Sequence, residues 1–329
     1  MTHDAYIRGL GFYVPETVVT NADLEKIVET TDEWITTRTG IKERRVAAAG
    51  QASSDLALGA AKAALADAGM EADELTHILV YTLTPDFYCP PTACLLEEKL
   101  GIRGKFAQDL NAACSGFVYG LETARAIVAL HPEAKVLLCA AEVLTSRTNW
   151  ADRRTCVLFG DGASAAVIAA TPGRGSAHII DARLYSDGSL GHLLTVKGGG
   201  SAAPLKLGDV VGEDFFVEMA GQEVFKHAVR NMVSVCEEVL AAAGATTDEV
   251  AFLIPHQANM RIIDAVAKKL SIPTERCVIT IDRYGNSSAS SVGIALAEAR
   301  GAGRIQPGAL VLLAVFGGGF TWGASLLQF

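Results

Sequence analysis

The sequence lacks the features that mark membrane-spanning, secreted and metal-binding proteins. No apolar run approaches the ~20 residues of a membrane-spanning helix, and the first residues, Met-Thr-His-Asp-Ala-Tyr-Ile-Arg, contain no hydrophobic signal core. The seven Cys residues form no Cys-x-x-Cys pair, and Cys89 and Cys94, the two closest in sequence, have no His nearby. We therefore expect a cytoplasmic protein with reduced thiols, no membrane segment and no metal site.

Positive charge is also scarce. The chain has 28 Lys and Arg against 37 Asp and Glu, a net charge of −9, which argues against nucleic acid as the main partner. No Gly-x-Gly-x-x-Gly follows the first predicted strand, and no Lys-Ser or Lys-Thr follows the glycine run at 317–319. A nucleotide-dependent oxidoreductase and a phosphate-binding loop are therefore disfavoured. The remaining composition is that of a globular protein, and 329 residues predict about two domains.

One α/β pattern occurs twice along the chain. Predicted helices end at Gly69 and Gly244, and predicted strands begin at Val136 and Val311, so both landmarks recur after 175 residues. Helices over 112–121 and 287–297 are rich in Ala, Ser and Gly, which favours burial between the two copies. We predict an α/β fold of five layers, α/β/α/β/α, in which two mostly parallel sheets related by a pseudo-twofold axis enclose buried helices. The predicted halves are residues 1–175, carrying a candidate Cys, and 176–329, carrying a candidate His and Asn.

Cys114 lies at a predicted strand-to-helix junction. Residues 111–117 read Asn-Ala-Ala-Cys-Ser-Gly-Phe, and apolar residues then recur three and four apart, as one helix face requires. A Cys at a helix start meets the positive end of the helix dipole, which favours the thiolate and can lower its pKa below the usual value of about 8.5. The alternative is a small buried hydrophobe that allows close packing.

His256 and Asn286 are predicted to approach Cys114. His256 follows the predicted strand over 252–255, at the edge where open α/β sheets place their ligands. Asn286 precedes the small-residue helix of the second half, as Cys114 precedes that of the first. Each has a structural alternative, a hydrogen-bonded His or a helix-capping Asn. Together, the three groups suit transfer of an acyl group to the thiolate and stabilisation of an enolate oxygen by imidazole and amide.

Five motifs carry a resemblance to a known family. They are residues 32–41, 111–117, 255–259 (Pro-His-Gln-Ala-Asn), 284–287 (Tyr-Gly-Asn-Ser) and 316–323 (Phe-Gly-Gly-Gly-Phe-Thr-Trp-Gly). On these motifs the whole chain resembles the thiolase-like condensing enzymes, most closely the β-ketoacyl-acyl-carrier-protein synthase III family, which initiates dissociated (type II) fatty-acid biosynthesis. The resemblance implies a decarboxylative Claisen condensation. Cys114 would take the acyl group of an acyl-CoA primer, and the enolate from malonyl-acyl carrier protein, held by His256 and Asn286, would attack it to give 3-oxoacyl-acyl carrier protein, CoA and CO2.

The resemblance also assigns the residues around this centre. The backbone N–H groups of Cys114 and Gly318 would form the oxyanion hole, with the glycine run leaving room for the substrate. The CoA contacts would be Thr30, Trp34, Arg38 and Arg153; the carrier-protein contacts Arg261, Lys268 and Lys269; and the acyl-pocket residues Cys89 and Phe316. A homodimer is implied, and no cofactor, because the CoA thioester is itself a substrate. For Trp34 the alternative is a core contact, and for the charged residues a solvated surface.

Two departures and several rival functions remain. Cys89 stands where better-known members place a bulky aromatic residue from the partner subunit, which predicts room for a longer or branched primer. The stretch 150–152 before Arg153 is short. The nearest rival is a sister condensing or acyl-transferring enzyme that uses other CoA or carrier-protein thioesters in secondary metabolism. A chain-elongating synthase is disfavoured because Asn286 replaces a second His, and a degradative thiolase because no Cys follows Cys277. A non-catalytic acyl-binding scaffold is a further alternative.

Overall fold

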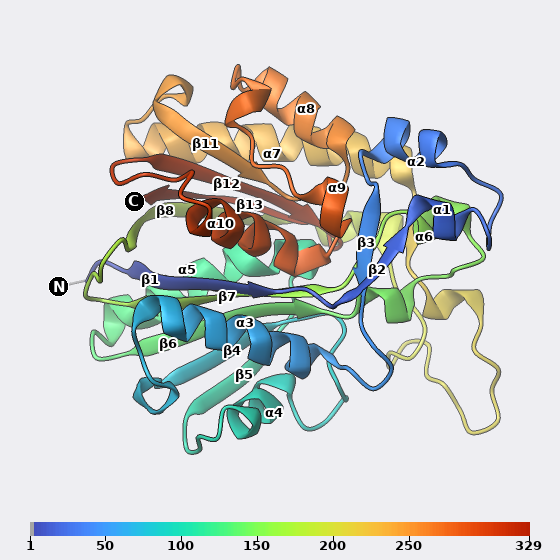
Figure 1. The fold of residues 1–329 in the computed structure, drawn as a ribbon, viewed down its shortest axis with the longest axis horizontal. Coiled ribbons are helices and arrows are strands. Elements are labelled where there is room, and N and C mark those ends of the chain that lie inside the picture. Colours follow the sequence, from blue (N-terminus) through green and yellow to red (C-terminus); the bar gives the residue numbers. More distant parts are fainter. Residues whose placement is uncertain (1–2) are drawn as a thin grey trace.

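The computed structural model describes residues 3–329 and is organised around two β-sheets that meet along one pair of strands (Figure 1). The first sheet has the order β5 (Phe106–Leu110), β4 (His77–Tyr81), β6 (Lys135–Glu142), β7 (Gly162–Ala169) and β1 (Tyr6–Tyr13). The second has the order β8 (Ala177–Ser186), β13 (Thr321–Gln328), β12 (Leu310–Gly317) and β11 (Val250–Pro255). Strand β1 pairs with β8 only at Tyr6–His178 and Ile7–Ala177, so the two sheets join into one at a corner.

The sheets are mixed in their pairing, although most strands share a direction. Strands β4, β5 and β6 pair in parallel, as do β11 and β12, but β7 runs antiparallel to both of its neighbours and so does β13. Most strands of each sheet therefore run in one direction, as predicted, but the prediction missed one antiparallel strand inside each sheet. In the second sheet, β13 must run antiparallel to β12 because only the short turn 318–320 connects them.

The helices form three layers around the sheets. Helices α3 (Ser53–Ala68) and α4 (Thr92–Lys99) cover the outer face of the first sheet, and α7 (Gly221–Ala243) and α8 (Met260–Lys269) cover the second. Between the sheets lie α5 (Gly116–Leu130) and α10 (Ser291–Gly301), whose apolar side chains share one core with strands of both sheets (Figure 1). The predicted five layers and buried helices are confirmed.

The internal repeat is confirmed at the ends of helices as well as in the strands. Gly69 after α3 and Gly244 after α7 both adopt left-handed backbone, with φ of 61° and 65°. Each is followed by a 3-10 turn and then by a strand, β4 or β11. Between the two halves, β7 ends at Ala169 and β8 begins at Ala177.

The remaining elements are short and build the rim of the molecule. The segment 17–46 contains β2 (Thr17–Thr20), α1 (Asn21–Leu24), α2 (Asp32–Thr39) and β3 (Glu43–Val46), and it packs against α8 and α9 (Ile281–Tyr284). The other short elements are η1 (Ala72–Glu74), η2 (Ala113–Ser115), η3 (Leu144–Arg147), α6 (Arg153–Cys156), η4 (Gly188–Leu193), β9 (Leu194–Thr195), η5 (Glu213–Phe215), β10 (Glu218–Met219), η6 (Thr247–Glu249), η7 (Thr274–Arg276) and η8 (Ser288–Ser290). An arm between β9 and β10 extends from the body (Figure 1). Over residues 3–329, no helix has the length and apolarity that a bilayer crossing requires.

Candidate active site

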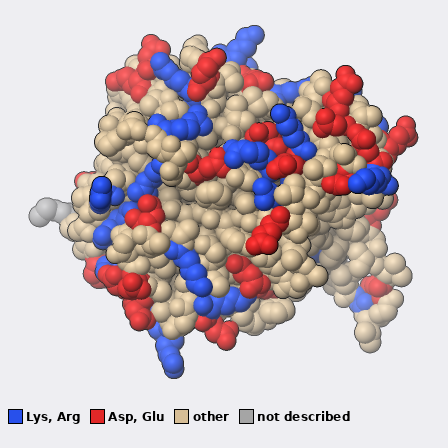
Figure 2. Space-filling model, in the orientation of Figure 1, with Lys and Arg blue, Asp and Glu red and all other residues tan. Residues whose placement is uncertain are grey.

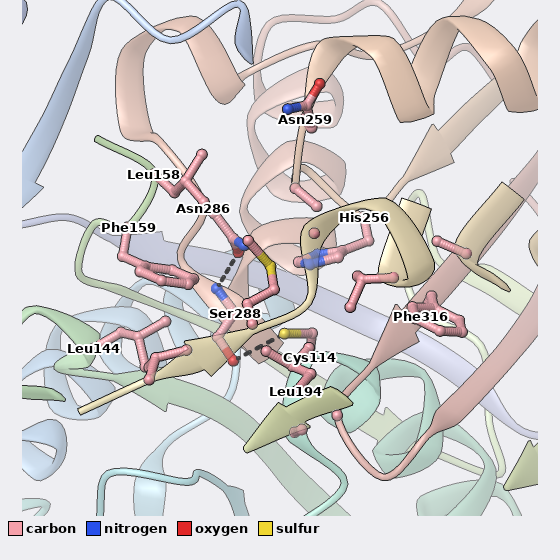
Figure 3. Close-up of a pocket in the computed structure, with 18 of the residues that line it drawn as sticks. Cys114, Leu144, Leu158, Phe159, Leu194, His256, Asn259, Asn286, Ser288 and Phe316 are labelled. Atoms are coloured by element: carbon pink, nitrogen blue, oxygen red, sulfur yellow. Dashed lines mark hydrogen bonds between the residues drawn. The ribbon is translucent and has the colours of Figure 1, made fainter. Parts of the chain in front are cut away.

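Cys114, His256 and Asn286 face one cavity of about 1200 Å³. Figure 3 shows the three side chains converging from separate elements, with Ser288 beside Cys114 and Phe316 on the far wall. The rest of the inner wall is mostly apolar and includes Leu144, Leu158, Phe159, Leu194 and Met232. The structure thus brings the three predicted residues together in one cavity.

Cys114 is held at the start of a buried helix by contacts with the β12–β13 hairpin. It lies in η2, directly before α5, and is only 9% exposed. Thr321 Oγ1 donates to the Ala112 carbonyl at 2.9 Å, and Ser115 Oγ donates to the Thr321 carbonyl at 3.1 Å. A Cβ on Gly317 would come within 2.7 Å of the Cys114 backbone nitrogen, so only glycine allows this approach.

Burial controls the ionisation of Cys114. Loss of solvent, with a smaller contribution from the carboxyl group of Glu142, raises the pKa of the thiol to about 11. The Ser288 hydroxyl and the backbone N–H groups of Cys114 and Gly318 act in the opposite direction, because they donate toward the sulfur. The expectation that the helix start would lower this pKa is wrong, since desolvation is the larger effect. The assignment of these two N–H groups to an oxyanion hole stays a prediction.

His256 is a neutral, oriented imidazole. It follows β11, is 3% exposed, and its backbone N–H donates to the Ala314 carbonyl at 2.7 Å. Burial lowers its pKa to about 4, so the ring carries no charge at neutral pH. Nδ1 forms a hydrogen bond of 2.7 Å with Ser291 Oγ, so Nε2 is the ring nitrogen that remains for a ligand.

The amide of Asn286 is also fixed in orientation. Its Oδ1 accepts the backbone N–H of Ser288 at 2.9 Å, so the NH2 group remains available in the cavity (Figure 3). The preceding Gly285 has φ 63° and ψ −159°, a combination that side chains other than glycine rarely tolerate. The backbone N–H of Asn286 itself donates to the Leu158 carbonyl at 2.8 Å. The site therefore presents one thiol, one imidazole nitrogen and one amide to the same space.

Three of the four predicted CoA residues lie together, because Arg38 and Arg153 both stack on Trp34. The guanidinium carbons of Arg38 and Arg153 lie 4.5 Å and 4.7 Å from the centre of the Trp34 ring. Trp34 and Arg38 line the cavity, whereas Arg153 lies beside it and donates to the Glu29 carbonyl at 2.8 Å. Thr30 has a buried hydroxyl oxygen that forms no hydrogen bond with any residue in 3–329.

The predicted carrier-protein residues lie on the exposed face of α8. Arg261, Lys268 and Lys269 are all exposed, and Arg261 also lines the cavity mouth. None of them pairs with an acidic side chain in the described chain. Figure 2 shows Lys and Arg intermixed with Asp and Glu over one face of the molecule, with no broad area of a single sign.

The two predicted acyl-pocket residues are placed differently. Phe316 lines the cavity and its ring centre lies 4.8 Å from that of Phe320. Cys89 is exposed and does not line the cavity, although the neighbouring Tyr88 does. Its predicted role depends on a second subunit and stays a prediction. Among residues 3–329, no group of His, Cys, Asp or Glu is arranged to hold a metal ion.

Sequence reasoning missed three polar residues that support the site: Ser288, Ser291 and Glu142. Ser288 and Ser291 were hidden in a run of small residues that predicted only close packing. Glu142 ends the strand Lys135–Glu142 after six apolar residues, and an acid in that position is the one available signal.

A buried Cys, His and Asn at the junction of two repeated α/β halves define a condensing enzyme of the thiolase-like class. The chain belongs to the 3-oxoacyl-[acyl-carrier-protein] synthase III family, whose model matches residues 108–188, with the C-terminal model of the same family matching residues 240–329. It is 61% identical to the β-ketoacyl-[acyl-carrier-protein] synthase III of Nitratidesulfovibrio vulgaris (strain Miyazaki F) over 98% of this chain and 97% of that protein.

Solved structures agree with this assignment. The 3-oxoacyl-[acyl-carrier-protein] synthase III of Aquifex aeolicus VF5 has a TM-score of 0.90 and 47% identity, covering 99% of this chain and all of that one. The priming β-ketosynthase of the R1128 polyketide pathway has a TM-score of 0.88 and 31% identity, over 99% of this chain and 97% of that one.

Proposed function

We propose that this protein condenses an acyl-CoA primer with malonyl-acyl carrier protein and thereby initiates type II fatty-acid synthesis. The observation that carries the proposal is the shared cavity of Cys114, His256 and Asn286, in which the backbone N–H groups of Cys114 and Gly318 face the sulfur. Membership of the synthase III family and 61% identity to a full-length relative support the same reaction.

In the first half-reaction, Cys114 attacks the thioester carbon of the primer. The S–C bond to Cys114 forms, the thioester oxygen becomes an oxyanion between the N–H groups of Cys114 and Gly318, and CoA leaves as a thiolate. The apolar wall around Phe316 then receives the acyl chain. Removing one oxyanion donor typically costs about 2.7–4 kcal/mol in the barrier.

In the second half-reaction, malonyl-acyl carrier protein loses CO2 in the same cavity. The electron pair of the broken C–C bond moves into an enolate, whose oxygen accepts hydrogen bonds from His256 Nε2–H and the Asn286 NH2 group. This role requires Nε2 to carry the proton, which follows when Ser291 donates to Nδ1. The enolate carbon attacks the acyl carbon and the Cys114 thiolate leaves. The chemistry requires no resident cofactor, because CoA and the carrier protein deliver both reactants as thioesters.

The surface residues fit the two thioester carriers. Trp34, flanked by Arg38 and Arg153, offers a ring and two positive charges to an adenine nucleotide. Thr30 precedes Trp34 by four residues and completes the proposed set of CoA contacts. Arg261, with Lys268 and Lys269 farther along α8, offers positive charge to an acidic carrier protein.

A homodimer in the cytoplasm completes the proposal. Phe87 and Tyr88 are 60% and 84% exposed, and Leu207 and Val210 on the arm are exposed almost completely. Apolar side chains exposed in this way fit a surface that a second subunit covers. In the dimer, Cys89 would face the acyl pocket of the partner.

Intact-protein mass spectrometry tests the proposed function. After incubation with acetyl-, isobutyryl- or hexanoyl-CoA, the protein should gain the mass of one acyl group, and Cys114→Ala should gain none. Added malonyl-acyl carrier protein should then discharge the acyl-enzyme and yield 3-oxoacyl-acyl carrier protein. Discharge by malonyl-CoA but not by the carrier protein would favour the sister enzyme of secondary metabolism. Absence of an adduct with every CoA ester would refute both functions.

A further inference from the structure

A buried carboxyl group lies behind the nucleophile and is separated from it by a single hydroxyl. Ser288 Oγ lies 3.5 Å from Cys114 Sγ and 3.1 Å from Glu142 Oε1. Figure 3 shows the contact between Ser288 and Cys114. Glu142 ends β6, Cys114 lies in η2 and Ser288 in η8, so this row of contacts joins the two halves of the molecule.

Glu142 is compensated only by neutral donors. It is fully buried, and its Oε2 accepts from Thr84 Oγ1 at 2.7 Å, Leu83 N at 3.2 Å and Thr82 Oγ1 at 3.3 Å. In the part of the chain that the structure describes, no Lys or Arg pairs with it. A buried carboxylate without a positive partner readily accepts a proton. Burial accordingly raises the pKa of Glu142 to about 7, despite these hydrogen bonds.

Ser288 has one hydroxyl proton and two acceptors within reach. When Cys114 is a thiol and Glu142 a carboxylate, the hydroxyl donates to Glu142 and the S–H group faces Ser288 Oγ. When Cys114 is a thiolate, the hydroxyl donates to the sulfur and Glu142 carries the proton that Ser288 released. Passing from the first arrangement to the second breaks the S–H bond and forms an O–H bond on Glu142, and no net charge enters the cavity.

We propose that Ser288 and Glu142 form a proton relay that accepts the thiol proton of Cys114 as its sulfur attacks the primer thioester. Ser288 is the catalytic member, because it contacts the reacting sulfur, and Glu142 acts through it. CoA leaves as a thiolate and is protonated by water. When condensation releases the Cys114 thiolate, Glu142 returns the stored proton through Ser288. The relay rests on the proposed function only in taking Cys114 as the nucleophile.

His256 is the other candidate acceptor and suits this step less well. Its Nδ1 is engaged by Ser291, and burial lowers its pKa to about 4, so its free nitrogen is a weak base. The enolate step also needs a proton on Nε2, which leaves no lone pair there. The relay therefore frees His256 to act in the second half-reaction alone.

The rate at which iodoacetamide alkylates Cys114, measured against pH, tests the relay without any CoA ester. In the wild type the rate constant should rise to about pH 7 and then stay level, because above that pH the pair shares one proton. In Glu142→Gln and in Ser288→Ala, the rate constant of alkylation at pH 7.5 should be at least about 10-fold lower than in the wild type. In both variants the rate constant should rise about tenfold with each pH unit, without a level region. The double variant should be no slower than either single one.

A purely structural carboxylate predicts the opposite sign. Its negative charge raises the pKa of the thiol, so Glu142→Gln would then be alkylated faster than the wild type, and that result overturns the relay. Ser290→Ala is the matched control, because the Ser290 hydroxyl donates to the Ser287 carbonyl at 2.8 Å and should leave the profile unchanged. If Glu142→Gln does not fold, the shape of the pH profile of Ser288→Ala decides, because this variant retains the contacts of Glu142 with Thr82, Thr84 and Leu83. Loss of the relay removes the level region above pH 7, whereas loss of a hydrogen bond to the thiolate alone lowers the rate and keeps that region, a result that overturns the relay. A wild type that is alkylated with the expected profile but never acylated would refute the proposed function and leave the relay standing.

Discussion

Ala113 and Ser288 adopt the same unusual backbone conformation at equivalent positions of the two halves. They are 175 residues apart, with φ of 46° and 51°, and each begins the 3-10 turn that leads into a buried helix. A positive φ outside glycine costs on the order of 1–3 kcal/mol and persists only where the surroundings impose it. The repeat pairs Cys114 with Ala289, so only one half carries a thiol. Ser288, at the start of the other helix, supplies the hydroxyl that faces it.

The close approach of Gly317 to Cys114 predicts a severe effect of one added methyl group. In Gly317→Ala the new Cβ would lie 2.7 Å from the Cys114 backbone nitrogen, so the hairpin or η2 must move. We expect acylation by acyl-CoA to fall about 10²-fold, as when an oxyanion donor is misplaced, and the free energy of unfolding to fall by about 1–3 kcal/mol. Stopped-flow acylation and urea unfolding measure the two effects.

A second alanine substitution controls for helix and glycine effects. Gly301 ends α10, and a Cβ there meets no atom within 4 Å. Gly301→Ala should therefore leave acylation unchanged and stabilise the protein by about 0.5–1 kcal/mol. Normal acylation in Gly317→Ala would show that the contact between hairpin and nucleophile does not position the oxyanion hole.

The two half-reactions should separate in variants of His256 and Asn286. Both side chains are expected to contact the enolate and not the primer, so His256→Ala and Asn286→Ala should still form acyl-Cys114. Release of 3-oxoacyl product should fall by about 10²–10³-fold in each. Mass spectrometry of the acyl-enzyme and assay of CO2 release measure the steps independently. Equal loss of both steps would place these residues in the first half-reaction instead.

The stability of the protein should carry opposite pH contributions from His256 and Glu142. Folding lowers the pKa of His256 to about 4. The contribution of His256 to the free energy of unfolding is therefore fully present above about pH 6.5 and is lost as the pH falls toward 4. The pKa of Glu142 is raised to about 7, so its contribution is present below 4.5 and is lost as the pH rises. Between pH 5 and 7 the two slopes oppose each other, and the wild type should show little net dependence from this pair.

Variants at the two positions should expose the separate slopes. When the pH is lowered from 7 to 5, the free energy of unfolding of Glu142→Gln should fall by about 2 kcal/mol more than that of the wild type. The reason is that the opposing contribution of Glu142 is gone and only that of His256 remains. His256→Asn should gain a similar amount over the same range. Urea unfolding at both pH values provides the measurement. Parallel pH profiles for all three proteins would show that neither group changes its protonation on folding.

The sequence was sufficient to predict the layers and the meeting of Cys114 with its partners, because those follow from periodicity and the repeat. Gly69 and Gly244 are local signals that any observer of the chain can pair. Glu142 and Ser288 could not be found in this way, since their contact crosses the interface between the halves. The raised pKa of Cys114 was missed for the same reason: its burial comes from residues far away in sequence, whereas the helix dipole is a local effect.

Charge reversal on α8 should weaken use of the carrier protein without affecting the primer. In Lys268→Glu and Lys269→Glu, the KM for malonyl-acyl carrier protein should rise about 3–10-fold at low salt and converge with the wild type at high salt. Acylation of Cys114 by acyl-CoA should be unchanged. Lys62→Glu, on the exposed face of α3, is a control of the same charge change on the opposite side of the molecule. An equal rise in that control would indicate net charge and not a docking surface.

Cys89 provides a test of the dimer and of primer size at once. The side chain is exposed in the single chain and does not line the cavity of its own subunit. If a second subunit covers the exposed Phe87 and Tyr88, Cys89 faces the acyl pocket of that subunit, and its small size leaves room for a longer or branched primer. Cys89→Phe should then reduce kcat/KM for isobutyryl- and hexanoyl-CoA by about 10-fold or more, as an overfilled pocket does. Turnover of acetyl-CoA should change little.

The control and the oligomeric state make this prediction decisive. Cys94→Val alters a neighbouring, partly buried thiol without adding a ring, and should keep the wild-type primer range. Sedimentation should give a dimer for the wild type and both variants, because the larger side chain points into a pocket and not into the interface core. Strict acetyl preference of the wild type would refute the predicted room for longer primers. A monomer that retains the wild-type primer range would show instead that the pocket is closed by residues of one chain, and Cys89→Phe should then leave primer choice unchanged.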